Sequence, residues 1–126
     1  MSELQIGETV TGIYKTGKYI GEITEVRHQH YLVRVLAVVK HPMQGDLHNP
    51  KEADVMIFHE RKALSFREQA NIPKQMVKPF KEDVPNYLES LKQAVDKMKT
   101  ELTEIATPWA DMSLKSLASL EKDYFK

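Results

Sequence analysis

The chain has 126 residues and a mass of 14.5 kDa, with 41% hydrophobic and 29% charged residues, which is typical of one soluble globular domain. Its 18 basic residues balance 18 acidic ones, so no overall electrostatic field favours nucleic acid or an anionic membrane. The absence of cysteine excludes disulfides, thiolate chemistry and cysteine-linked lipid anchors. Because neither a signal peptide nor an apolar run of about 18 residues is present, we expect a cytoplasmic protein without direct membrane insertion.

The first predicted elements are two strands that form a hairpin. From residue 7 to about residue 64 the apolar residues recur with a period near two, and many are β-branched or aromatic, which predicts β structure. The runs at residues 8–16 and 18–26 flank Gly17, which can adopt the positive φ of a tight turn. We therefore expect these two strands to be antiparallel neighbours.

Two further strands are predicted beyond this hairpin. The run YLVRVLAVV at residues 31–39 has apolar residues on both faces, interrupted only by Arg34, so both faces need to be covered. The run ADVMIFHERKAL at residues 53–64 repeats this pattern and follows the loop HPMQGDLHNP at residues 41–50. Four strands within about sixty residues predict a small antiparallel meander or barrel.

The second half of the chain predicts an irregular connector followed by helices. Residues 65–83 contain two prolines and mixed polar residues, with a short strand or turn expected near Met76 and Val77. From residue 84 to about residue 105 the apolar spacing alternates between four and three, which predicts an amphipathic helix with Asp83 as N-cap. The apolar stripe of this helix consists of Val84, Leu88, Leu91, Val95, Met98, Leu102 and Ile105.

A second helix is predicted after Thr107, which is a favoured N-cap and precedes a proline that is tolerated in the first turn. Asp111 complements the dipole of this helix. Because the connection is so short, the helices form a hairpin or an abrupt corner, with Trp109 at a core position. We expect this hairpin, residues 81–126, to pack on the β half, residues 1–80, as one structural unit, while self-association through the stripe stays open.

The loop at residues 41–50 carries the main candidate site. His41, Asp46 and His48 offer nitrogen and oxygen ligands for a metal, but their spacing matches no motif of defined geometry. The prolines, glycine, aspartate and asparagine of the loop are equally typical of a turn. We therefore interpret it as a structural or recognition loop without catalytic, cofactor or metal residues. The side chains predicted to contact a partner are His41, Gln44, Asp46, His48 and Asn49.

Two other functions are weighed against partner binding. An RNA-binding barrel would use aromatic and basic residues of the β half, but residues 1–80 carry 11 basic and 9 acidic groups, which leaves few unbalanced charges for phosphate contacts. A metal-dependent enzyme would rely on the histidines of the loop, and the sequence has neither a nucleophile elbow nor a glycine-rich phosphate loop. We therefore expect a non-enzymatic protein that binds neither cofactors nor nucleic acid.

Four stretches of the sequence together resemble the kinase-associated protein B family of endospore-forming bacteria. They are YKTGKYIGEI at residues 14–23, VKHPMQGDLHNP at residues 39–50, FHERKAL at residues 58–64 and VPNYLESL at residues 84–91. The resemblance extends over the whole chain and implies an SH3-like β-barrel of about five antiparallel strands followed by helices. This agrees with the α+β class predicted from the residues.

The resemblance also implies a function. The family is linked to a membrane sensor histidine kinase that feeds the sporulation phosphorelay, so we expect a regulatory or adaptor protein that acts by protein–protein interaction. The family is sometimes described as lipoproteins, but this chain has no cysteine to lipidate. Any location at the membrane is therefore expected to come through a partner.

Overall fold

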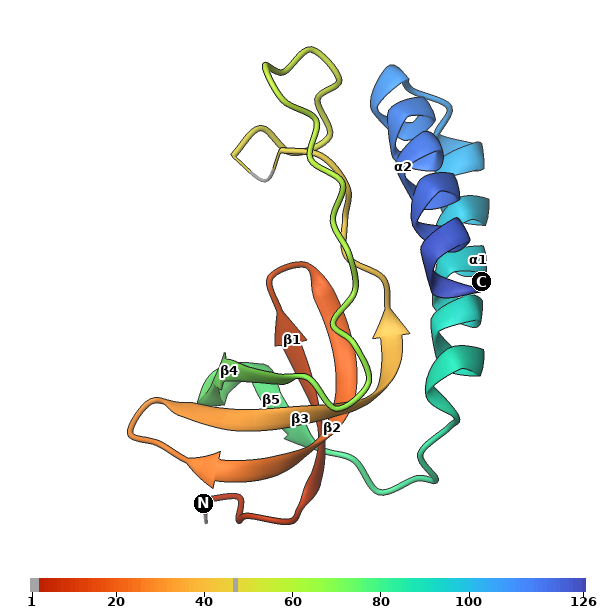
Figure 1. Ribbon diagram of the computed structural model, residues 1–126. Coiled ribbons are helices and arrows are strands. Elements are labelled where there is room, and N and C mark those ends of the chain that lie inside the picture. The colour runs from red at the N-terminus through yellow and green to blue at the C-terminus, as the bar shows by residue number, and fades with distance from the viewer. Residues whose placement is uncertain (1–2, 47) are drawn as a thin grey trace.

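The computed structural model describes residues 3–46 and 48–126, which form five strands, a short 3-10 helix and two α-helices (Figure 1). In chain order the elements are β1 (Thr9–Tyr14), β2 (Gly17–Val26), β3 (His30–Lys40), β4 (Gln69–Pro73), η1 (Lys74–Met76), β5 (Val77–Pro79), α1 (Tyr87–Ile105) and α2 (Pro108–Tyr124). One antiparallel sheet with two α-helices confirms the predicted α+β class.

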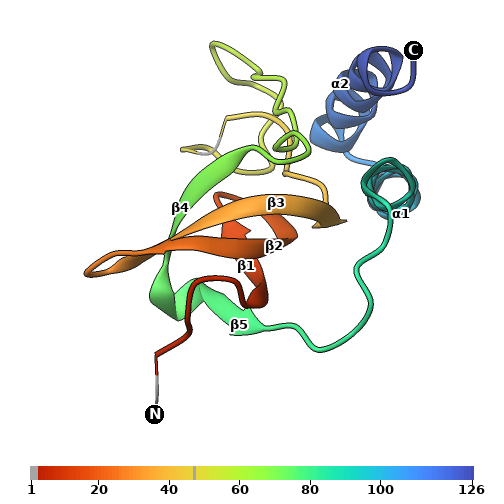
Figure 2. The same cartoon turned by 60° about the horizontal axis from the view of Figure 1, so that its bottom comes forward.

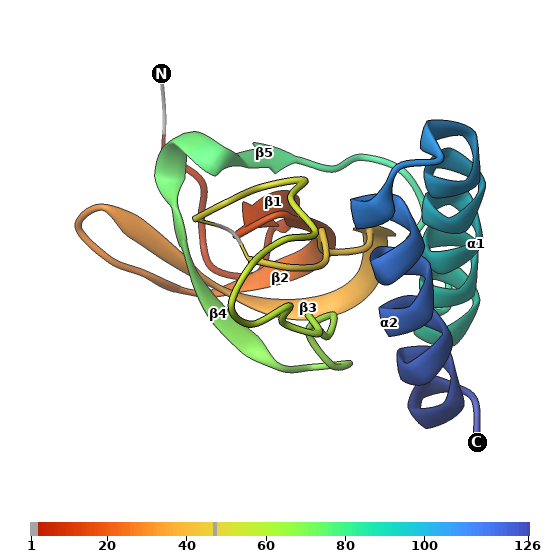
Figure 3. The same cartoon turned by 90° about the horizontal axis from the view of Figure 1, so that it is seen from above.

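The five strands form one antiparallel sheet in the order β4-β3-β2-β1-β5. The strands curl around a shared interior, and both helices lie on one side of them (Figures 2 and 3). The curl brings β1 close to β4. This is shown at Gly12 of β1, where a Cβ would lie 2.7 Å from Cδ1 of Ile72 of β4. Within the described residues β4 and β5 do not pair with each other, so the sheet is open and the SH3-like barrel stays a prediction.

Irregularities in the β2–β3 ladder contribute to this curl, since β-bulges bend a strand and increase its local twist. The register shifts between Lys18 and Tyr19, between Ile20 and Gly21, and between Ile23 and Glu25. At the second of these places a Cβ on Gly21 would lie 2.5 Å from the backbone oxygen of Arg34. Only glycine allows the two backbones to approach so closely here.

The β1–β2 hairpin is confirmed, but the reason for its glycine differs from the predicted one. The strands are joined by Lys15 and Thr16, and Lys15 is the turn residue with positive φ, at 55°. Gly17 is needed for space instead, because a Cβ there would lie 2.5 Å from Oη of Tyr19. The hydroxyl of Tyr19 accepts a hydrogen bond from the backbone N–H of Leu64.

The prediction of a fourth strand at residues 53–64 is wrong. These residues contain no strand, and β4 lies at Gln69–Pro73, inside the stretch that was expected to be a connector. Phe58 packs beside the helices and Ala63 at the junction of sheet and helix, whereas Met56 and Ile57 are exposed. The pattern of apolar residues in this stretch therefore does not reflect pairing with another strand. The short strand expected near Val77 is confirmed as β5.

Buried apolar residues form three clusters along the molecule. The first fills the curled sheet, the second joins the sheet to α1, and the third joins both helices to residues between β3 and β4. Tyr14 and Leu64 pack against both of the first two clusters, so the interior of the sheet is continuous with the helix interface. Trp109 is buried in the third cluster, as predicted for a core residue at the corner between the helices.

The caps of the two helices decide where each begins. The side chain of Asn86, and not that of Asp83, accepts the amide hydrogen of the third residue of its helix, so α1 begins three residues later than predicted. For α2 the prediction is confirmed, because Thr107 caps the helix and Pro108 is its first residue. Ala106, the first of the two residues between these helices, has a left-handed backbone with φ of 53°, which ends α1 and allows the tight corner.

The predicted apolar stripe of α1 is buried in its centre and exposed at both ends. Leu91, Val95 and Leu102 are buried, Met98 is half-buried, and Val84, Leu88 and Ile105 are exposed. The buried centre packs against the last part of β3, whose Val35 and Val38 belong to the same cluster. The helix therefore covers the last part of β3, a strand that the sequence predicts to be covered on both faces.

Ser90 of α1 completes the hydrogen bonding of β3. Strand β4 pairs with β3 only at residues 30–34, and two further backbone bonds involve Val35, so the end of β3 has an open edge. The Oγ of Ser90 accepts a hydrogen bond from the backbone N–H of Val38 at 2.9 Å and donates one to the carbonyl of Tyr87 at 2.7 Å. A buried N–H without such a partner would be costly, so this hydroxyl stabilises the contact between helix and sheet.

We expect replacement of Ser90 by alanine to lower the free energy of unfolding by about 1–3 kcal/mol, because the N–H of Val38 would be buried without a partner. Urea unfolding followed by circular dichroism measures this. Ser119, which is exposed on α2, provides the matched control, since Ser119→Ala should change stability only through the higher helix propensity of alanine, by about 0.5 kcal/mol or less. Equal effects of the two substitutions would show that the hydroxyl of Ser90 contributes nothing.

Candidate partner-binding surface

The chain between β3 and β4, residues 41–68, is the most unusual part of the fold and is called the long segment below. Within its described residues it contains no helix or strand. It rises from the end of β3, runs beside α2 and returns to β4 (Figures 1 and 3). All five residues that the sequence predicts to contact a partner belong to it.

Three tyrosine hydroxyls hold the returning part of the long segment. The Oη of Tyr124 accepts a hydrogen bond from the backbone N–H of Ala63 at 2.8 Å, and the Oη of Tyr19 accepts one from the N–H of Leu64 at 3.2 Å. Tyr87 donates its hydroxyl hydrogen to the carbonyl of Leu64. Burial raises the pKa of all three phenols, that of Tyr124 to about 12, so each keeps its proton at neutral pH.

His41 is fully buried at the start of the long segment, and both of its ring nitrogens are bonded. Its Nδ1 lies 3.0 Å from the carbonyl of Pro42, and its Nε2 lies 2.9 Å from Oη of Tyr124. The carbonyl of Pro42 can only accept, so Nδ1 carries a proton, and in the neutral ring Nε2 accepts the hydroxyl hydrogen of Tyr124. Burial lowers the pKa of His41, which agrees with this neutral form.

Gln44 is also buried and fastens the two arms of the long segment to each other. Its Oε1 accepts from the backbone N–H of Arg61, and its Nε2 donates to the carbonyl of the same residue, both at 2.8 Å. The backbone carbonyl of Gln44 accepts the indole N–H of Trp109 at 3.1 Å, which ties this point to α2. His41 and Gln44 are predicted from the sequence to contact a partner, but both side chains are buried and hydrogen-bonded inside the fold.

Asp46 and Asn49 form a turn that the structure places near the surface. One carboxylate oxygen of Asp46 accepts the backbone N–H of His48 at 2.9 Å, and the other accepts the side-chain amide of Asn49 at 3.1 Å. These hydrogen bonds lower the pKa of Asp46. His48 and Asn49 are exposed, so of the five predicted residues these two and Asp46 are placed where a partner could reach them. Partner binding by them stays a prediction.

The far end of the long segment exposes an apolar tip that the sequence analysis missed. Met56 is fully exposed and Ile57 is 57% exposed, while Val55 is half-buried. Contiguous exposed apolar side chains mark interaction sites where the patch is large enough, which makes this tip a candidate. The signal was present in the sequence, because apolar residues occupy both faces of the run that was interpreted as a strand.

A second apolar surface lies where α1 begins. A groove of about 630 Å³ is lined there mainly by apolar side chains, with Phe66 and Leu88 both more than half exposed. Phe66 packs against Tyr87 with ring centroids 5.7 Å apart.

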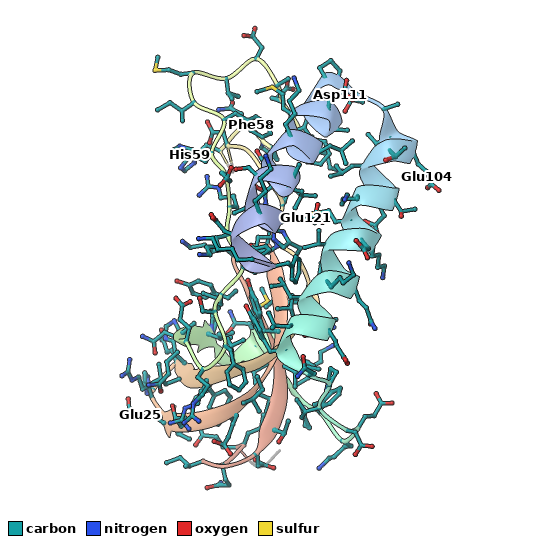
Figure 4. The ribbon with its side chains drawn as sticks, turned by 45° about the vertical axis from the view of Figure 1, so that its right-hand side comes forward. Glu25, Phe58, His59, Glu104, Asp111 and Glu121 are labelled. Carbon is teal, nitrogen blue, oxygen red and sulfur yellow. The ribbon has the colours of Figure 1, made fainter. Side chains whose placement is uncertain are left out.

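The α1–α2 corner, marked by Glu104 and Asp111, lies at the opposite end of the molecule from Glu25 in the β2–β3 hairpin (Figure 4).

Among residues 3–46 and 48–126, His, Asp and Glu side chains nowhere gather in a group of three or more that could hold a metal ion. Neither of the helices in this part of the chain has the length and apolar character needed to span a bilayer.

Comparisons with known proteins find close relatives along almost the whole chain. The family model described as Kinase associated protein B matches residues 14–125. A protein of Bacillus subtilis (strain 168), Kinase-associated lipoprotein B, is 58% identical over 125 residues, which cover 99% of this chain and 98% of that protein. The X-ray crystal structure of kinase-associated protein B from Bacillus cereus is similar with a TM-score of 0.83 and 48% identity, covering 97% of this chain and 98% of that one.

We expect the stability of the protein to fall as the pH is lowered through 6.5, because His41 is neutral in the folded state and becomes protonated on unfolding. Its folded pKa lies below 6.5, so between the two values the unfolded chain binds more protons, and the loss levels off below the folded pKa. Urea unfolding between pH 8 and pH 5 measures this. His41→Asn keeps a donor for the carbonyl of Pro42 and should remove this part of the pH dependence.

The matched control for this experiment is His28→Asn, because His28 is exposed between β2 and β3. It should leave the slope of stability against pH as it is in the unaltered protein. If His41→Asn retains the full slope between pH 6.5 and pH 5, then His41 is not the group whose burial links stability to pH.

Proposed function

The chain belongs to the kinase-associated protein B family, and we propose on this basis that it is a non-enzymatic protein that binds a sensor histidine kinase and regulates it. The support comes from relatives whose printed names describe association with a kinase and which match this chain over nearly its whole length. Because the match leaves no large part of the chain unaligned, whatever surface those relatives use has its counterpart here. The regulated pathway in this proposal is the phosphorelay of sporulation, with any contact to the membrane made through the kinase.

The surface proposed for the kinase is the outer part of the long segment. Its apolar tip at Met56 and Ile57 offers side chains whose removal from water on binding would favour association. The turn that carries His48 and Asn49 offers polar groups that can add specificity. An apolar centre with polar groups around it is the usual composition of a protein–protein interface.

We propose that residues 1–80 and 81–126 act as one unit in this function. In support, the second apolar cluster contains residues from β2, β3, the long segment and α1. The hydrogen bonds of Tyr87 and Tyr124, from the two helices, end on the long segment itself. The helices therefore hold the proposed binding surface in its shape, and loss of the helices would remove the surface as well.

The double substitution Met56→Glu and Ile57→Glu tests the proposed surface. Both side chains are exposed, so the variant should fold with nearly unchanged stability but bind the cytoplasmic part of the cognate kinase about tenfold or more weakly, as expected for anchor residues. Biolayer interferometry with immobilised kinase measures the affinity. His48→Ala should weaken the same interaction by a smaller factor.

Leu88→Glu is the matched control, because Leu88 is also exposed and apolar but lies in the groove at the start of α1. It should bind the kinase like the unaltered protein. If Leu88→Glu abolishes binding while the double variant retains it, the groove is the interface and the proposed surface is wrong. If the unaltered protein shows no saturable binding at micromolar concentrations, direct association with that kinase is wrong.

A further inference from the structure

The methionines of this chain differ strongly in their exposure to solvent. The sequence contains six methionines and no cysteine, so thioethers are its only sulfur groups. Five of the six belong to the described residues: Met43, Met98 and Met112 are half-buried, Met76 is 44% exposed and Met56 is fully exposed. Met56 is therefore the most accessible sulfur group in the part of the chain that the structure describes.

A fully exposed thioether is open to oxidation by hydroperoxides. One oxygen of hydrogen peroxide is transferred to the sulfur, the O–O bond breaks and water leaves, so the sulfur is oxidised by two electrons to a sulfoxide while the peroxide is reduced. In many proteins an accessible thiolate competes for the oxidant, but this chain has none. A hydroperoxide that meets the folded chain should therefore react first at Met56.

The position of Met56 gives this reaction a consequence for binding. Met56 is next to Ile57 in the exposed apolar tip of the long segment, which is the proposed contact to the kinase. Oxidation converts the apolar thioether into a polar sulfoxide, and a polar group that is buried without a hydrogen bond disfavours association. The oxidised tip therefore loses part of its apolar surface.

The same reaction should leave the fold intact. No other described part of the chain covers Met56, so its sulfoxide stays in water. Met43 and Met98, in contrast, pack against the third apolar cluster. Oxidation of these two would place a polar group among buried side chains and lower the stability of the protein. Oxidation of Met56 can therefore alter binding without unfolding the chain.

We propose that Met56 is a reversible oxidation site and that its conversion to the sulfoxide by a hydroperoxide weakens binding of the kinase at the tip of the long segment. The effect on binding rests on the proposed function, whereas the site of oxidation does not. A thiol-dependent methionine sulfoxide reductase reverses the reaction: two thiols become a disulfide, and the sulfoxide oxygen leaves as water. The exposed position of Met56 makes it accessible to such an enzyme.

The first experiment measures the order of oxidation without the kinase. The full chain is treated with hydrogen peroxide, and the gain of one oxygen is followed over time by mass spectrometry of tryptic peptides. Because trypsin cleaves after lysine and arginine, these five methionines lie in five different peptides, with Met56 in residues 52–61. Met56 should be oxidised at least about threefold faster than Met76 and about tenfold faster than the three half-buried methionines. In urea the five rates should become similar, because their exposure no longer differs.

The second experiment measures binding of the cytoplasmic part of the cognate kinase by biolayer interferometry, with the peroxide removed beforehand. Oxidised protein should bind about fivefold or more weakly, as expected when an anchor residue is altered, with an unchanged melting temperature. Treatment with the reductase and dithiothreitol should restore the affinity. Met56→Leu keeps an apolar tip and should bind equally before and after oxidation. Met76→Leu is the matched control and should lose affinity on oxidation like the unaltered protein.

Each part of the proposal can fail by itself. Oxidation of Met76 as fast as Met56 in the folded chain would refute the assigned site. Unchanged kinase binding after complete conversion of Met56 would refute its control of binding, and so would an equal loss of affinity in oxidised Met56→Leu. Absence of kinase binding before oxidation would instead refute the proposed function, and the order of oxidation would still decide the assigned site.

Discussion

Any stretch of chain without regular secondary structure needs partners for its backbone hydrogen-bonding groups, and in this protein side chains from distant elements provide them. Backbone N–H groups of the long segment donate hydrogen bonds to the hydroxyls of Tyr19 of β2 and Tyr124 of α2, and Gln44 joins its two arms. Each of these groups is itself buried or half-buried, so the bonds are shielded from competing water. The proposed binding surface consequently depends on contacts made well below it.

The helices contribute hydrogen bonds to backbone groups of other elements and not only apolar cover. The hydroxyl of Ser90 accepts from a backbone N–H at the open edge of β3, and the indole of Trp109 donates to the carbonyl of Gln44. The hydroxyls of Tyr87 and Tyr124 bond to backbone groups of the long segment. In each case a residue with an apolar or compact body carries one polar atom to a specific backbone group. Burial supplies most of the stabilisation, whereas these hydrogen bonds fix one arrangement of helix, sheet and segment.

Local signals in the sequence predicted the parts of the fold that local interactions determine. Thr107 and Pro108 correctly marked the start of α2, and the spacing of Leu91, Val95 and Leu102 correctly marked the buried face of α1. The long segment could not be predicted in this way, because the hydroxyls that hold Ala63 and Leu64 come from positions 61 and 45 residues away. For the same reason the burial of His41 and Gln44 could not be predicted, because it depends on partners such as Tyr124 and Arg61 that no pattern of spacing reveals.

The contact between His41 and Tyr124 joins residues 83 positions apart, which has a consequence for synthesis on the ribosome. When the long segment leaves the exit tunnel, the tyrosine that completes its hydrogen bonding has not yet been translated. Until then Phe58 and Ala63 lack the helix surfaces they pack on, and of the regular elements only the strands, which all precede the helices, can be complete. During elongation the nascent chain therefore exposes apolar side chains of the long segment. This segment becomes ordered only after α2 has been synthesised, as is usual for contacts between residues far apart in the sequence.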